Sequence, residues 1–403
     1  MTLEYEKIQS DLERMARITA ARRGEQAEHI TAAAATLRRY RTNWSAVEQA
    51  LDTARHRSDP KFFRAARPFA AAEPLDAAIP APPPPDQATI IATDGSQIPP
   101  DRHAPFLYYL INIGGLVYHH GGIRSPEPFT LPELVYPESD ADLDRFSGGG
   151  AVNIERDLKE IDTLARQAVA YRQEAQPLLA LLDQRLLYWP IGSEGVAVNT
   201  AVSDWNGSME SIHAAGALLC GYIDRPETIA VMTLLRALEG LADDDFDWKL
   251  LGKRQATQGI TDRLLFGPLL GPGERSAVFT FVSDPNDTFA GYNTAHEVSF
   301  FYLNPGGFGE QIARIDIPHW VAENAAAVTA VHALVVDQCR LIGDYPYALA
   351  RADEMAVVGR RDAAELNTML EIIMQRHGVE SDQTAKQNSK ELARGGKTRH
   401  EGV

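Results

Sequence analysis

The stretch ATIIATDGS, residues 88–96, decides the fold of this chain. Its first six residues are apolar or β-branched, which predicts a short buried strand. The aspartate, glycine and serine that follow predict a tight turn at the end of that strand. The backbone would then hold the Asp94 carboxylate at the edge of a sheet, and Gly95 would let a metal ion or a phosphate approach closely. Alternatively, Asp94 is an ordinary turn residue, because Asp-Gly is a common turn dipeptide.

The segments that follow predict a mixed sheet. Residues 106–113 and 116–118 resemble strands joined by a pair of glycines, and residues 153–174 have apolar side chains near helical spacing. The apolar run at 177–189 predicts a second buried strand, with Asp183 on it. Three strands followed by a helix and a strand is the order that an RNase H-like sheet requires. We therefore expect an α/β fold, an RNase H-like mixed β-sheet flanked by helices, with an N-terminal helical arm.

Composition shifts along the chain predict four parts. Residues 1–72 form the helical arm, because residues 3–57 contain no proline and have helical apolar spacing. A Pro/Ala-rich linker spans residues 73–87, since consecutive prolines fit neither a helix nor a central strand. The RNase H-like domain spans residues 88–378, and a disordered polar tail spans residues 379–403.

The overall composition predicts a cytoplasmic protein without a membrane span. The chain has 403 residues, two cysteines and a formal net charge of -16. The cysteines form neither a metal-ligand pair nor a disulfide framework, which favours a reducing compartment. No apolar run approaches the roughly 20 residues that cross a bilayer. The acidic balance disfavours tight non-specific DNA binding but does not exclude a DNA substrate, because cation-binding nucleases concentrate carboxylates.

Four acids are candidate metal ligands. Asp94 and Asp183 are each associated with an apolar run, and a carboxylate among leucines is unfavourable unless it is paired or metal-bound. The alternative for Asp183 is a cap at the end of a strand, exposed to water. Glu160 and Asp353 lie on predicted helices, where the alternative is a solvated helix face. Together they would suit phosphodiester hydrolysis by two divalent ions about 4 Å apart. Oxygen ligands select Mg²⁺ or Mn²⁺ over Zn²⁺.

Other common chemistries lack their motifs. The chain has no Gly-x-Ser-x-Gly nucleophile elbow and no Walker A loop. Two adjacent histidines, His119 and His120, suggest a metal-ligand pair at first sight. Neighbouring side chains on a strand point to opposite faces, so we interpret this pair as the end of a hairpin.

Six short motifs, in order, resemble those of the NurA-domain nuclease family. They span roughly residues 88–375. The motifs are IATDGSQ (91–97), LLD (181–183) with Leu186, GYIDRP (221–226), HEV (296–298) with FFY (300–302), RIDIP (314–318) and YPYAL (345–349).

This resemblance implies a fold, an activity and partners. NurA proteins are Mn²⁺-dependent nucleases with an RNase H-like fold. They act 5′ to 3′ on DNA ends and as endonucleases on single-stranded DNA. They form ring-like dimers and work with the hexameric translocase HerA in DNA end resection and repair. We expect the same here, with two Mn²⁺ or Mg²⁺ ions as cofactors and no membrane partner.

The resemblance also assigns the strand acids. The first family acid falls on Asp94 and the second strand acid on Asp183. The family often continues the second acid as Asp-Gly-Ser, whereas this chain has Asp-Gln-Arg at 183–185. The acid is kept and the turn after it changes.

The helix-borne residues follow in the same way. The helix acid falls on Glu160, with Glu155 as a rival. The late-helix histidine of archaeal members falls on Asp353, which can still bind Mg²⁺ or Mn²⁺. Tyr345 matches a family tyrosine near the site. Expected substrate contacts are Arg225 and Ser96.

Two other functions remain open on the sequence. A catalytically weak or silent DNA clamp or adaptor for a translocase would keep the fold and lose the chemistry. A small-molecule phosphohydrolase would have a closed pocket in place of a DNA-wide groove.

Overall fold

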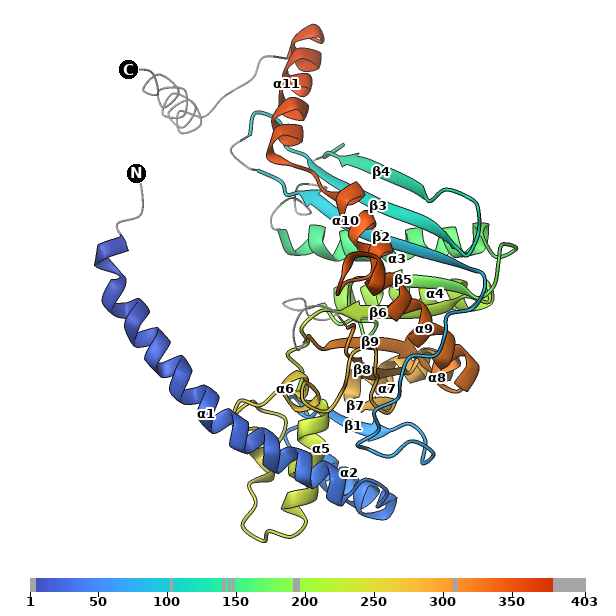
Figure 1. The fold of residues 1–403 in the computed structure, drawn as a ribbon. Helices are drawn as coiled ribbons and strands as arrows, with labels where there is room; N and C mark the ends of the chain where they lie inside the picture. The colour runs from blue at the N-terminus through green and yellow to red at the C-terminus, as the bar shows by residue number, and fades with distance from the viewer. Residues whose placement is uncertain are drawn as a thin grey trace. The chain divides into compact units, whose positions relative to one another are not determined.

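The computed structural model describes residues 5–101, 104–139, 143, 146, 149–190, 196–306 and 311–379. The chain divides into two compact units. The first comprises residues 1–86, 183–187 and 218–347, and the second comprises residues 87–182, 188–217 and 348–403. Figure 1 labels the elements of both, and each unit is described separately.

The second unit has the RNase H-like strand arrangement that the sequence predicts. Its strands lie in the order β5-β2-β3-β4, with β2, β3 and β4 antiparallel and β5 parallel to β2. Helix α3 connects the antiparallel strands to β5. The elements are β2 (Ala88–Ile98), β3 (Tyr109–His120), β4 (Glu127–Val135), α3 (Gly149–Ala170), β5 (Leu178–Leu182), α4 (Val196–Ala214), α10 (Tyr347–Ala356) and α11 (Arg360–Arg376).

The predicted turn after residue 93 is wrong. Strand β2 continues through Asp94, Gly95 and Ser96 to Ile98, and Asp94 pairs with Gly114 across the antiparallel ladder. The glycines at 114 and 115 do not end a strand either, because β3 runs unbroken from residue 109 to 120. The third antiparallel strand is β4, which was not predicted from the sequence.

Close contacts on both faces of β3 explain its two glycines. A Cβ atom on Gly114 would lie 2.1 Å from the backbone nitrogen of Ala356, in α10. A Cβ atom on Gly115 would lie 2.1 Å from the ring of Phe129, in β4. Glycine inside a strand often marks such a close approach and not a turn.

The core of the second unit lies between the sheet and α3. All five residues of β5 are buried. On α3, Ile161, Leu164 and Ala168 are buried at the spacing of one helical face. Burying each leucine or isoleucine contributes about 1.5–3 kcal/mol. This packing holds α3 against β2, so residues along α3 take defined positions over the strand.

The first unit contains an antiparallel run of strands in the order β1-β7-β8-β9-β6. Its strands are β1 (Ala65–Pro68), β6 (Leu218–Ile223), β7 (Phe279–Val282), β8 (Val298–Leu303) and β9 (Ala313–Pro318). Its helices are η1 (Tyr5–Lys7), α1 (Gln9–Arg39), α2 (Trp44–Arg57), α5 (Ala230–Gly240), η3 (Trp248–Leu250), α6 (Asp262–Phe266), α7 (Asp284–Tyr292), η4 (Thr294–His296), α8 (His319–Ala322) and α9 (Ala325–Ile342).

The predicted N-terminal helices are present as α1 and α2. Residues 65–68, which were predicted to belong to the helical arm, form β1 and pair with β7. Towards its C-terminal end α1 buries Leu37, whereas Leu12, Met15 and Ile18 near its beginning are exposed. The predicted polar tail lies outside the described residues from 380 onward.

A buried ion pair organises the middle of this unit. Arg314 donates from Nε to Oδ1 of Asp316 at 2.7 Å, and both side chains are almost fully buried. The guanidinium lies over the rings of Phe281 and Phe300, and Asp316 also accepts from the backbone N–H of Leu186. Both charges are therefore paired and hydrogen-bonded, which a buried ion pair needs.

Helix α9 is long and apolar enough, by length and composition alone, to cross a membrane. In the structure, 56% of that stretch is buried within the protein. Its buried side chains include Val331, Leu334 and Val335. A core helix has the same composition, so this feature is weak evidence for a membrane span.

We predict that Gly114→Ala destabilises the second unit by about 1–3 kcal/mol, because the new methyl group would overlap the backbone of α10. Chemical denaturation monitored by circular dichroism would measure this change. The matched control is Gly207→Ala, in the exposed middle of α4, where a Cβ meets nothing within 4 Å. There we expect stabilisation of about 0.5–1 kcal/mol. Equal effects of the two substitutions would contradict the close approach.

Candidate functional site

Strand β2 presents alternate residues to two different helices. Thr93 faces α3, where its hydroxyl donates to the backbone oxygen of Glu160 at 3.3 Å. Ser96 faces α10, where its hydroxyl donates to the backbone oxygen of Ala356. Because side chains alternate along a strand, Asp94 lies on the α10 side and Gly95 on the α3 side. The candidate first ligand therefore points toward α10.

The end of α10 is fixed to β3 by hydrogen bonds to its last carbonyl groups. Asn112 donates from Nδ2 to the backbone oxygens of Ala356 at 2.8 Å and Met355 at 3.1 Å. These carbonyls have no partners within the helix, so the side chain satisfies acceptors that a helix end leaves open. With Gly114 beneath the same turn, this contact fixes the position of Asp353, one turn earlier on α10.

Asp94 and Asp353 form a carboxylate pair. The pKa of Asp94 is raised from 3.8 to about 6, first by burial and then by hydrogen bonding and charge repulsion with Asp353. The Gly95 N–H, which donates to Asp94 Oδ1 at 2.7 Å, and the charge of Arg156 act in the opposite direction. A carboxylate whose charge is opposed by burial and by a second acid is stabilised by a nearby cation.

The helix acids lie on the other side of β2. Glu160 is buried on α3, with 3% of its surface exposed, and its backbone oxygen accepts from Thr93. Its rival Glu155 accepts a hydrogen bond from the hydroxyl of Tyr109 at 2.6 Å and lies 3.6 Å from Lys159 Nζ. The structure brings Asp94 and Asp353 together and places Glu160 beneath the strand, so a ligand role for Glu160 stays a prediction.

The carboxylate pair fits a hard divalent cation. Mg²⁺ is commonly held by only one or two protein carboxylates, and waters and substrate phosphates complete its shell. Within the described part of the chain, no group of three or more His, Cys, Asp or Glu side chains is arranged around one metal position. The described geometry thus fits an ion on Asp94 and Asp353, whereas the cage for two ions stays a prediction.

The remaining predicted residues have other observed surroundings. Asp183 directly follows β5 and belongs to the first unit. Tyr345 packs edge-on against Tyr222 with the ring centroids 5.3 Å apart. Arg225 is exposed, with Nε 3.8 Å from Asp224 Oδ2. The Ser96 hydroxyl serves the end of α10, and its predicted role in binding substrate stays untested.

Two residues of this site were missed from the sequence. Asn112 holds the end of α10, and nothing in its local sequence indicated that role. Arg156 lies over Gly95, four residues before Glu160 and hence on the same face of α3. The i, i+4 spacing of Arg156 and Glu160 is visible in the sequence, and it was the one feature there that could have indicated a role for Arg156. The space above Gly95, which we expected to admit a metal ion or phosphate, holds the alkyl chain of Arg156.

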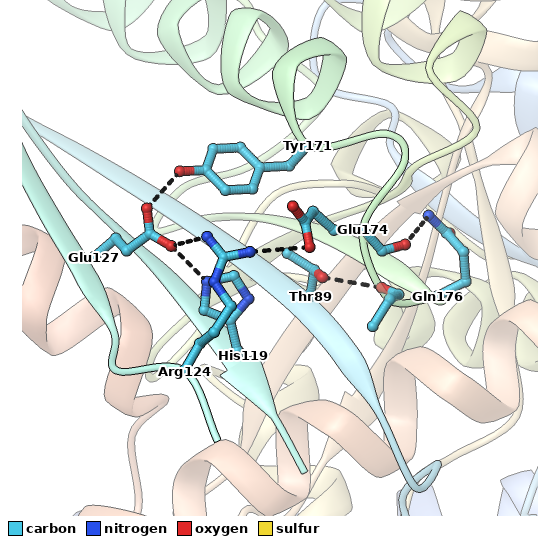
Figure 2. Close-up of polar contacts among 8 residues, drawn as sticks. Thr89, His119, Arg124, Glu127, Tyr171, Glu174 and Gln176 are labelled. Atoms are coloured by element: carbon cyan, nitrogen blue, oxygen red, sulfur yellow. Dashed lines mark hydrogen bonds and ion pairs between the residues drawn. The ribbon is translucent and has the colours of Figure 1, made fainter. Parts of the chain in front are cut away.

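The paired histidines lie at a hairpin end, as predicted. Strand β3 ends at His120, and His119 Nε2 lies 2.8 Å from Glu127 Oε1 on β4. Figure 2 shows that Tyr171 and Arg124 converge on the same carboxylate, with the Tyr171 hydroxyl at 2.9 Å from Oε2. Arg124 also pairs with Glu174 at 3.0 Å. This cluster ties the hairpin to the segment after α3.

Comparisons with known proteins point to one family. A family model for the NurA domain matches residues 88–358, more than half of the chain. Among solved structures, the chain is similar to the NurA nuclease from Sulfolobus solfataricus, with 12% identity, a TM-score of 0.40, and coverage of 83% of this chain and 92% of that one. It is also similar to the catalytic domain of human endonuclease V, with 13% identity, a TM-score of 0.32, and coverage of 81% and 96%. No curated protein matches the chain.

We predict that the hairpin cluster stabilises the protein in a pH-dependent way. Hydrogen bonds from His119 and Tyr171, together with the charge of Arg124, lower the pKa of Glu127 below 4.5. The stabilisation is therefore fully present above pH 4.5 and lost as the pH falls through the lowered pKa. The melting temperature of Glu127→Gln should lie below wild type at about pH 7, and the gap should narrow near about pH 3.

The expected gap is small because Glu127 is partly exposed and solvent screens its ion pairs. Asp162→Asn, which removes an exposed carboxylate paired with Arg166, is the matched control. A gap that stays constant between the two pH values would contradict the role of Glu127.

We predict that Asp94→Asn and Asp353→Asn each weaken Mn²⁺ binding by about tenfold or more, because each removes one charged oxygen ligand of the pair. Isothermal titration calorimetry would measure the affinity. Glu354→Gln is the control, since Glu354 neighbours Asp353 but pairs with Arg351 on the surface. Unchanged Mn²⁺ affinity in both aspartate variants would show that the ion does not bind there.

Proposed function

Because the chain belongs to the NurA domain family, we propose that it is a divalent-metal-dependent DNA nuclease, a phosphodiester hydrolase. The observation that carries this proposal is the pair Asp94 and Asp353, brought together by the docking of α10 on β3. A single acid on the surface would give little support to the proposal of a nuclease. A half-buried acid whose pKa is raised by burial and by a second acid is typical of a functional site.

The proposed roles of the side chains follow from their positions. Asp94 and Asp353 hold one Mn²⁺ or Mg²⁺ ion. Glu160 and Asp183 remain the further proposed metal ligands, and two ions are proposed in all. Leu182, the residue before Asp183, pairs with Thr93 in the parallel ladder, so each proposed strand ligand comes one residue after that pair. When bound, such ions activate the attacking water and neutralise charge on the scissile phosphate.

The finer parts of the proposal rest on the family resemblance. They are 5′ to 3′ exonuclease and single-strand endonuclease activity, work in DNA end resection and repair with a HerA-type hexameric translocase, assembly as a homodimer, and a cytoplasmic location. Tyr345, Arg225 and Ser96 remain the proposed accessory and substrate-binding residues. The exposed apolar side chains of Leu12, Met15 and Ile18 on α1 are consistent with a protein partner.

A catalytically silent DNA clamp or adaptor is the second candidate. One observation favours it, namely that the described residues offer no group of three metal-binding side chains. Such a protein would bind DNA and leave it uncut in the presence of Mn²⁺.

The deciding experiment incubates the full chain with end-labelled single-stranded and duplex DNA and Mn²⁺. We expect cleavage by wild type and by Glu354→Gln, and a fall of about hundredfold or more for Asp94→Asn, because metal-based charge stabilisation amounts to several kcal/mol. Binding without cleavage by wild type would favour the clamp. Equal cleavage by Asp94→Asn and wild type would remove Asp94 from the site.

A further inference from the structure

Arg156 lies directly against the strand that carries Asp94. A Cβ atom built on Gly95 would lie 2.8 Å from Cγ and 3.2 Å from Cδ of Arg156. The alkyl chain of the arginine therefore occupies the space that any larger residue at 95 would need. The glycine beside the candidate ligand thus serves to admit this arginine, and the packing fixes where its guanidinium lies.

The guanidinium retains free donor capacity. Nε and Nη2 both donate to the same oxygen, Oδ1 of Asp157, at 3.2 and 2.6 Å. Within the described residues, Nη1 donates no hydrogen bond, and 31% of the side chain is exposed to solvent. A guanidinium has five N–H groups in a planar fork. Those that remain open suit the two oxygens of an incoming phosphate.

The charge of the arginine also reaches the carboxylate site. This charge acts on both Asp94 and Glu160, which lie on opposite sides of β2. The ladder between β2 and β5 ends at Thr93 and Leu182, so residues 94–98 of β2 are paired with β3 alone. The Arg156 side chain over Gly95 therefore lies beside Asp94, just beyond the point where the pairing of β2 with β5 ends.

We propose that Arg156 contacts a phosphate of the DNA strand beside Asp94, on the α3 side of β2, and so positions the strand on which the Asp94–Asp353 pair acts. This inference rests on the proposed nuclease function and adds to it a residue that binds substrate. A structural role alone, in which Arg156 only balances the charge of Asp157 and Glu160, would make it important for stability but not for DNA binding. The two roles differ in the salt dependence of DNA affinity, because each phosphate contact releases condensed counterions.

The test measures binding of a fluorescein-labelled single-stranded oligonucleotide to the full chain by anisotropy, without divalent metal and over a series of salt concentrations. We expect Arg156→Gln to weaken binding about tenfold and to reduce the magnitude of the salt slope by about 0.7, the value for one contact to single-stranded nucleic acid. Arg156→Lys should recover part of the affinity and not the whole, because lysine lacks the planar fork.

Two further variants separate position from charge. Gly95→Ala keeps the arginine but displaces its alkyl chain, so it should weaken binding in the same direction as Arg156→Gln. Arg166→Gln removes an exposed arginine of the same helix, paired with Asp162, and should behave as wild type. Melting temperatures of all variants show whether each one is folded.

The outcomes distinguish this inference from the proposed function. Arg156→Gln binding DNA with the affinity and salt slope of Arg166→Gln would overturn the inference, whether or not the protein melts at a lower temperature. If wild type cleaves DNA with Mn²⁺ and Arg156→Gln cleaves equally well, the nuclease proposal stands and the phosphate contact falls. If wild type does not cleave, the nuclease proposal fails, and the binding series still decides the role of Arg156.

Discussion

The arrangement of the second unit depends on the contact between the end of α10 and Gly114 of β3. This contact is backbone against backbone, since a single methyl group on the glycine would overlap the helix. Close packing of this kind leaves the helix little room to shift, because protein interiors contain few voids. Hydrogen bonds from Asn112 and Ser96 to the final carbonyl groups then set the rotation of the helix. The approach of Asp353 to Asp94 follows from that geometry.

Charged side chains of opposite sign lie close together around β2. Two carboxylates meet on the α10 side of β2, and Glu160 is buried on the α3 side. Arg156 lies on the α3 side, over Gly95, and its charge acts on both Asp94 and Glu160. Burial of like charges is unfavourable unless cations or protons accompany them. Asp94, Glu160 and Arg156 therefore form one electrostatic system.

Much of the fold could be predicted from the sequence, because hydrophobic periodicity is local. The strands at 88–93 and 178–182 and the helix after residue 149 follow from it directly. Gly114 was misassigned because a glycine pair has two physical uses, the positive φ of a turn and the close approach of another segment. Only the tertiary partner distinguishes them, and α10 lies more than two hundred residues further along the chain. The sequence indicated Asp94 and Asp353 as candidate ligands, but their proximity depends on the packing of α10 against β3.

The alternation along β2 has a consequence for how changes in this strand would act. Successive residues face different helices, with Asp94 toward α10 and Gly95 toward α3. Inserting or deleting one residue upstream within the strand would exchange these faces, as any register slip does. The carboxylate would then meet the alkyl chain of Arg156, and the glycine would leave an empty space beside Asp353. The register of β2, as much as the identity of its residues, therefore determines which face of the strand carries the Asp94 carboxylate.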